Sequence, residues 1–264
     1  MKNAIQKEWE KVLRQEQRFL HASRKKSPEW TQTMGTKIEE KIPDIVVEKL
    51  QQAFDKAFYV VFEKGEAIVE KTFSKENLHL EFEVNDYRVE KSPTRRSLRK
   101  VEGLSKKGNL RNLCLTTVEG VGLGVVGVGL PDIPLFLAVL MKGLYEMAAS
   151  YGYDYSEERE RVFLLRLIQA ALAEEDMRVA ADQAVEHCMN EPQMSYIFTD
   201  EISKTAKTLS ITMLVAKFIQ GLPLVGVAGG IVNPIIYQKV QKYAALKYKK
   251  RYLKQRMRIR LEES

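Results

Sequence analysis

The chain has 264 residues, of which 45% are hydrophobic, and it carries a formal net charge of +7. This length and apolar content can bury a sizeable core, which excludes a disordered protein and fits one large domain or two small ones. The two cysteines, Cys114 and Cys188, are too few for a disulfide framework, so the composition favours a reducing, cytoplasmic setting.

The amino terminus predicts an amphipathic helix. Its charges recur every two or three residues, so it lacks the continuous apolar core of a signal peptide. Apolar residues such as Ile5, Trp9 and Val12 instead follow helical spacing. We expect a helix within residues 1–35 that lies against the body or a partner, followed by one helical domain over residues 36–264.

The next segments continue the helical pattern with one exception. Residues 36–73 predict one or two helices, with Pro43 in a first turn and Gly65 as the weak point. The stretch NLHLEFEVND, residues 77–86, alternates apolar and polar residues as a strand does. The sequence offers this strand no partner, so we treat the stretch as an irregular or helical connection.

Positive charge is concentrated in two segments. Residues 88–111 hold nine basic and two acidic residues, and residues 238–264 hold ten basic and two acidic residues. This asymmetry predicts an oriented surface with an anionic partner, such as membrane headgroups or nucleic acid, although part of each cluster could be a solvated helix face. The candidate membrane or partner contacts are Arg95, Arg96, Lys239, Lys242, Lys249, Lys250, Arg251 and Arg256.

Two Gly-rich apolar runs form a paired feature, one after the first basic segment and one before the tail. The G-x-G-x-x-G match at residues 122–127 has no βαβ context, so it does not indicate a dinucleotide site. Gly120 and Gly124, like Gly226 and Gly230, share one helical face, which allows close helix packing. The alternative interpretation of the same residues is a Gly-rich hairpin that inserts reversibly into lipid.

A strongly apolar helix is predicted over residues 135–151. Asp132 is placed to cap its start, Pro134 lies in the first turn, and Gly152 is placed as a left-handed residue after its end. A buried functional acid is the alternative for Asp132. Three further helices are expected near residues 156–176, 176–190 and 192–209.

The tail predicts a basic amphipathic helix with tyrosines on its apolar side. Such a helix can lie on an anionic membrane, or it can pack into the core with one solvated face. Residues 121–141 and 211–236 are long enough to span a bilayer. Asp132 in the first segment, and Lys217 and Asn233 in the second, argue against full spanning.

No catalytic constellation stands out. The chain has no Walker-type loop and no G-x-S-x-G motif. His187 and Cys188 are adjacent, so on a helix they point about 100° apart and do not form a metal pair. We therefore predict no catalytic residue, cofactor or metal, and no nucleic-acid partner, because no binding motif accompanies the charge.

Two motifs resemble those of the EcsC family. They are GVGLPDIPLFLAVLMKGLYEMAASYGYD, residues 127–154, and GLPLVGVAGGIVNPIIYQKVQKYAALKYKKRYL, residues 221–253, in which Pro234 departs from the family pattern. That family is named for a bacterial protein encoded beside the subunits of an ABC transporter, and it has no established catalytic residues, so the resemblance implies a bacterial protein with no active site to carry over. The positions that match, taken as structural or interaction residues, are Asp132, Pro134, Gly152, Tyr153, Asp154, Gly226, Gly230 and Asn233.

Together these patterns predict a mainly α, single-domain helical bundle in which the two Gly-rich apolar segments pack together. We expect a non-enzymatic accessory protein, cytoplasmic and peripherally bound to the inner membrane face, with ABC transporter subunits as possible partners. The alternative is a carrier of a lipid-like ligand, or a lipid-acting enzyme, with a pocket between the Gly-rich helices. An integral membrane protein is a third hypothesis.

Overall fold

The computed structural model describes residues 4–21, 43–70, 74–104, 132–191, 195–219 and 232–262, and these residues form helices joined by turns, with no strand among them. The mainly α prediction is thus confirmed. A further short helix spans residues 95–104. The other helices are α1 (Ala4–Leu20), α3 (Asp44–Glu70), α4 (Lys75–Lys91), α6 (Asp132–Ser150), α7 (Glu158–Leu172), α8 (Arg178–Asn190), α9 (Phe198–Ile219) and α10 (Val232–Glu262).

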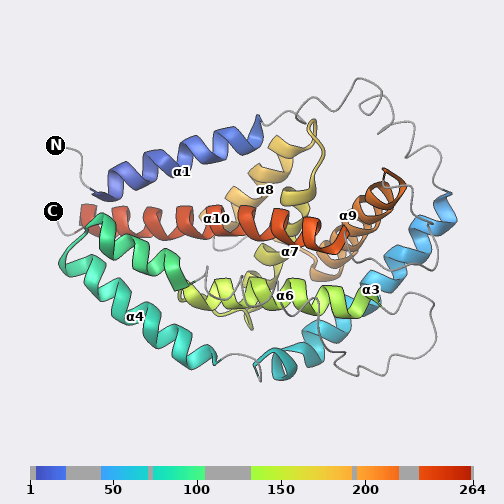
Figure 1. The fold of residues 1–264 in the computed structure, drawn as a ribbon, viewed down its shortest axis with the longest axis horizontal. Coiled ribbons are helices and arrows are strands. Elements are labelled where there is room, and N and C mark those ends of the chain that lie inside the picture. Colours follow the sequence, from blue (N-terminus) through green and yellow to red (C-terminus); the bar gives the residue numbers. More distant parts are fainter. Residues whose placement is uncertain are drawn as a thin grey trace.

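Helices α7 and α10 form the centre of the bundle. Helix α7 is buried between Val162 and Leu172 except at Arg166 and Gln169, which are half-buried on one face, so most of its circumference lies in the core. Helix α10, with 31 residues, packs against α1, α6, α7 and α9 (Figure 1). Helix α1 adds Ile5 and Val12 to the same core. The predicted amphipathic first helix is therefore an integral part of the bundle.

Helix α6 is the other strongly apolar element. Its window Ile133–Ser150 is long and apolar enough to cross a membrane, but 72% of that window is buried inside the protein. A core helix explains this burial. At Gly143, a Cβ atom would lie 2.5 Å from Gln241 Nε2 on α10, so the glycine permits a close approach of α6 and α10. The glycines predicted to serve this purpose, Gly120, Gly124, Gly226 and Gly230, lie outside the described residues.

Helix α4 lies at the edge of the bundle, where it packs chiefly against α6 (Figure 1). Its sequence is the stretch that alternates like a strand. On a helix of 3.6 residues per turn, residues two positions apart lie about 200° apart, so the alternation divides between two faces. Leu78 and Phe82 face the core, whereas Leu80 and Val84 are exposed. The helical reading of this segment is confirmed, and α4 is apolar on both sides.

Candidate functional site

Helix α10 carries three clasps of the same design. In each clasp a tyrosine hydroxyl and a cation three or four residues later bind one carboxylate from another helix. The hydroxyl oxygens lie 2.5 to 2.8 Å from their carboxylates. The three sets are Tyr243 and Lys247 on Asp182 of α8, Tyr248 and Arg251 on Glu160 of α7, and Tyr252 and Arg256 on Asp86 of α4. The clasps tie α10 to three neighbouring helices.

Burial and charge act together on the groups in these clasps. Burial, reinforced by the adjacent carboxylate, raises the pKa of each of the three tyrosines. Burial alone would lower the pKa of Lys247 and Arg251, but the neighbouring carboxylates outweigh it and raise both. The tyrosines therefore remain neutral donors and the cations remain charged at neutral pH.

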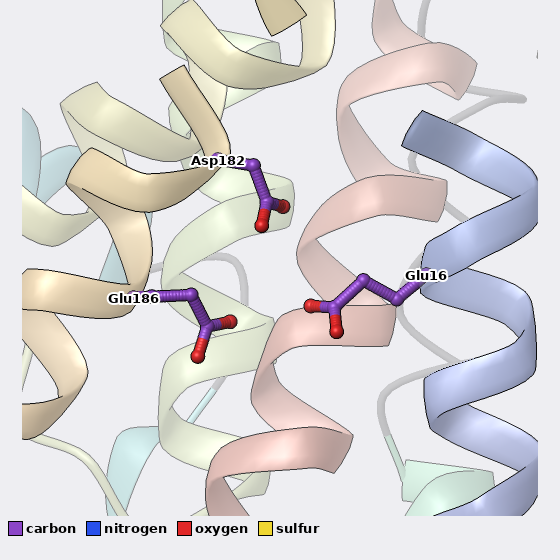
Figure 2. Close-up of side chains that lie close together, drawn as sticks. All are labelled: Glu16, Asp182 and Glu186. Carbon is purple, nitrogen blue, oxygen red and sulfur yellow. The ribbon is translucent and has the colours of Figure 1, made fainter. Parts of the chain in front are cut away.

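Three carboxylates converge beside the first clasp, as Figure 2 shows for Glu16 of α1 and for Asp182 and Glu186 of α8. Their oxygen atoms lie within 4.8 Å of one another, a spacing that could hold a metal ion. The Lys247 ammonium group occupies this position instead. Its Nζ lies 2.6 Å from both Asp182 and Glu186 and also contacts Glu16. Because Lys247 is 0% exposed, a divalent cation would have to displace a buried, fully paired ammonium group.

Lys250 completes the cluster. Its Nζ lies 2.6 Å from Glu16 Oε2 and 2.8 Å from Glu186 Oε1. Burial by itself would raise the pKa of Glu186, but Lys247 and Lys250 outweigh it and lower that pKa. Two lysines and three carboxylates therefore form a buried ionic network that joins α1, α8 and α10, and the arrangement is structural.

This network corrects the interpretation of the tail as a basic surface for four of its cations. Lys249 is buried between Glu8 and Glu102, and Lys250, Arg251 and Arg256 bind carboxylates within the bundle. These four cations are removed from the set of surface contacts, because their partners neutralise them inside the protein. On α10, Lys239, Lys242, Lys254 and Arg258 are exposed.

The basic segment that begins at Arg88 has a different environment from that of the tail. Arg95 and Arg96 are exposed, as are Arg88, Lys91, Arg99 and Lys100. We call residues 88–100 the basic surface; it holds these six cations and one carboxylate, that of Glu90. The structure therefore leaves the positive charge of this segment on the outside of the molecule.

The Tyr-Gly-Tyr-Asp motif forms the turn that ends α6. Gly152 has a φ of +77°, as predicted for a left-handed residue after the helix. Tyr153 N donates to Ala148 O and Gly152 N donates to Ala149 O, both at 3.0 Å, which is a Schellman motif. A Cβ atom on Gly152 would lie 2.5 Å from the ring of Phe82 on α4. The turn thus needs glycine both for its conformation and for space.

The next two residues of the motif fix the turn to neighbouring helices. The Arg251 guanidinium stacks 3.6 Å from the Tyr153 ring centroid. Asp154 accepts hydrogen bonds from Lys75 Nζ at 2.7 Å and from Ser156 N at 2.9 Å. Burial would raise the pKa of Asp154, but these donors lower it to about 2. Both residues have structural roles in the described turn.

The remaining motif positions divide in two groups. Pro134 lies in the first turn of α6, as predicted. The backbones of Asp132 and Asn233 lie in α6 and α10, but their side chains are outside the described set, so the capping role of Asp132 stays a prediction. The pocket expected between the Gly-rich segments also lies outside the described residues.

A polar groove of about 520 Å³ lies between α7, α8 and α9, and its walls include Arg166, His187 and Glu201. Arg166 binds Glu201 at 2.9 Å and contacts Cys188 Sγ at 3.3 Å, while His187 pairs with Glu191. Burial raises the pKa of the Cys188 thiol more than Arg166 lowers it. The thiol therefore stays protonated at neutral pH and is a poor nucleophile.

Comparison with known proteins places this architecture in a family. The model of the EcsC protein family matches residues 6–253, so the chain belongs to that family. It is 29% identical over 221 residues to "Protein EcsC" of Bacillus subtilis (strain 168), covering 81% of this chain and 83% of that one. It is also 42% identical over 60 residues, 22% of each chain, to "Uncharacterized protein YdbA" of the same organism. No solved structure matches the chain.

Proposed function

We propose that this member of the EcsC protein family is a non-enzymatic accessory protein that docks peripherally on the anionic inner face of a bacterial membrane. One observation carries the proposal: Leu80, Val84 and Tyr87 on the outer face of α4 are 57%, 52% and 58% exposed. Their spacing of four and three residues aligns them on one helical face. We call these three residues the outer stripe.

The position of the outer stripe supports a lipid partner. Helix α4 lies at the edge of the bundle (Figure 1) and its inner face is already packed. The exposure of the three stripe residues places them on the side away from the core. Contiguous exposed apolar residues mark interaction surfaces, and tyrosine is favoured at the level of the lipid headgroups. A helix that lies in the interface plane can bury such a stripe without spanning the bilayer.

The charges around the outer stripe give the docking an orientation. Exposed carboxylates, those of Glu76, Glu81 and Glu83, lie along the amino-terminal half of α4. The basic surface begins at the carboxyl-terminal end of the helix. Each lysine or arginine near an anionic membrane contributes about 1 kcal/mol. The carboxyl-terminal end of α4 therefore leads toward the membrane, and Tyr87 lies at that end.

Vesicle binding tests the proposal with a matched pair of variants. Val84→Asn changes the outer stripe, and Val179→Asn changes a valine of similar exposure, 44%, on α8. Burying a half-exposed valine contributes about 1.4 kcal/mol, so Val84→Asn should weaken co-sedimentation with phosphatidylglycerol vesicles about tenfold. Val179→Asn should bind as the unchanged chain does. Equal binding by both variants, or binding to zwitterionic vesicles that equals binding to anionic ones, would contradict the proposal.

The family resemblance supports a further part of the proposal, in which the docked protein assists an ABC transporter or another membrane assembly. Cross-linking in native membranes tests this part. Transporter subunits should be captured with the unchanged chain and with Val179→Asn, and less with Val84→Asn. Equal capture with Val84→Asn would show that the binding of transporter subunits does not depend on membrane docking through the outer stripe.

A further inference from the structure

Helix α1 separates its charges by sign. Its four cations are exposed, whereas Glu8 and Glu16 are buried and Glu10 is half-buried. The cations follow one another at spacings of four, three and four residues, which on a helix places them in a row along one face. At about 1.5 Å per residue, this row measures about 17 Å. We call it the cationic face; it consists of Lys7, Lys11, Arg14 and Arg18.

The opposite face of α1 binds the rest of the protein. Glu8 Oε2 accepts a hydrogen bond from Lys249 Nζ at 2.7 Å, and Glu16 binds two buried lysines of the same helix α10. Burial by itself would raise the pKa of Glu8, but Lys249 outweighs it and lowers that pKa. Lys11 lies farther from the Glu8 carboxylate, at 3.7 Å. The buried carboxylates of α1 are therefore committed to α10, and the cationic face is left to the solvent.

The composition of the exposed side of α1 favours a protein partner. Its exposed side chains are those of lysine, arginine and glutamine, so this side offers no apolar residue to bury in a lipid interface. Trp9 and Phe19, the aromatic residues of the helix, pack against the core and are not presented to nucleic-acid bases for stacking. A row of cations without exposed apolar or aromatic neighbours is complementary to a row of carboxylates.

The contact between α1 and α10 shows how two such helices fit together. There, two carboxylates eight residues apart on one helix, Glu8 and Glu16, meet lysines of the other helix. We infer that the cationic face binds an acidic helix of a partner protein, whose carboxylates recur at three- and four-residue spacings on one side. The inference goes beyond membrane docking and does not rest on it. Helices α1 and α4 lie at opposite edges of the bundle, with α10 and α6 between them, so the cationic face and the outer stripe can be occupied at once (Figure 1).

Two synthetic helical peptides test the inference. Both carry four glutamates in a sequence of alanine and glutamine. In the aligned peptide the glutamates have spacings of four, three and four residues, and in the scattered peptide they are distributed around the helix. In fluorescence anisotropy at low salt, the full chain should bind the aligned peptide about tenfold more tightly, the effect of about two ion pairs. The preference should shrink as salt is added, because exposed charges are screened.

A matched pair of double variants locates the binding. Lys11→Gln with Arg14→Gln changes the cationic face and should abolish the preference for the aligned peptide. Lys204→Gln with Lys207→Gln is the control, since these two exposed cations have the same spacing on α9, and it should keep the preference. Lys11 and Lys204 each lie near a glutamate three residues earlier, at 3.7 and 3.6 Å, so the two sites have similar local contacts. Both double variants should melt as the unchanged chain does, because the altered side chains are exposed.

The contrary outcomes are distinct. Equal binding of the two peptides, or loss of the preference in the α9 variant, overturns the inference, because general charge would then explain the binding. Duplex DNA that binds more tightly than the aligned peptide, and loses this binding in the α1 variant, replaces the acidic helix by a nucleic acid. A tenfold loss of binding to phosphatidylglycerol vesicles in the α1 variant assigns the cationic face to the membrane instead. Unchanged vesicle binding by Val84→Asn, with the peptide preference intact, overturns the docking alone and leaves the acidic partner in place.

Discussion

The buried ionic network predicts that the substitution Lys247→Met strongly destabilises the fold. Lys247 is 0% exposed and contacts three carboxylates. After the substitution, Lys250 is the one lysine of the network left, and it contacts two of them, those of Glu16 and Glu186. Removing one partner from a buried ion pair usually costs about 3 to 5 kcal/mol. We expect a loss in this range, which is a large part of a typical unfolding free energy of about 5 to 15 kcal/mol. The melting temperature should fall by about 6 to 20 °C.

Urea unfolding followed by circular dichroism measures this loss. Lys242→Met is the matched control, since Lys242 is exposed on the same helix, and it should stay within about 0.5 kcal/mol of the unchanged chain. Adding Glu186→Gln to Lys247→Met should restore part of the stability, because one uncompensated carboxylate is removed. A loss below about 1 kcal/mol for Lys247→Met, or no coupling to Glu186, would refute the argument that the tail is held by its internal charges.

Two further properties follow from the described contacts. Gly152→Ala should destabilise the fold by about 2 kcal/mol or more in thermal unfolding, because the positive φ and the contact with Phe82 both oppose a side chain. Gly103→Ala is the control: an added Cβ there meets nothing within 4 Å, so this variant should be neutral or stabilising. Stability should also depend on pH at both ends. The pKa of Glu186 is lowered by folding, so its carboxylate contributes stability above about pH 4.5, and this contribution is lost as the pH falls through the lowered pKa. The pKa of Lys247 is raised by folding, so its ammonium group contributes stability below about pH 10.5, and this contribution is lost as the pH rises through the raised pKa. Urea midpoints that are unchanged from pH 3 to 11 would contradict this.

Local signals in the sequence predicted most of the helices and one turn, although the helix at residues 95–104 was not predicted and α9 extends to Ile219, beyond its predicted end near residue 209. The apolar spacing of α1 and the acidic first turn of α7 are properties of neighbouring residues, and so is the position of Gly152 after α6. Such features depend on the backbone within a few residues, so sequence patterns report them directly. Gly143 was missed because its role depends on Gln241, a residue on another helix.

The alternating stretch in α4 shows a different limit. A period of two is typical of a strand that has one buried face, but the same residues also fit a helix with apolar residues on opposite faces. Only the position of α4 at the edge of the bundle tells which of these residues are exposed. The sequence did not distinguish Leu80 and Val84 from Leu78 and Phe82 in this stretch, because their exposure depends on the packing of Phe82 and Val89 against the core.

The two basic segments look alike in the sequence because their charges are counted without their partners. Lys247 meets Glu16, which lies 231 residues away in the chain, and Lys249 meets Glu8, which lies 241 residues away. A buried charge is tolerated only when a partner compensates for its lost hydration, so the central position of α10 requires its cations to be paired. The basic surface is under no such requirement, since its cations, on α4 and on the helix at residues 95–104, are exposed to water. Among the described residues of the two segments, the exposed cations are therefore those of residues 88–100 together with Lys239, Lys242, Lys254 and Arg258 of α10, and changes to the paired cations of the tail should act on folding before they act on binding.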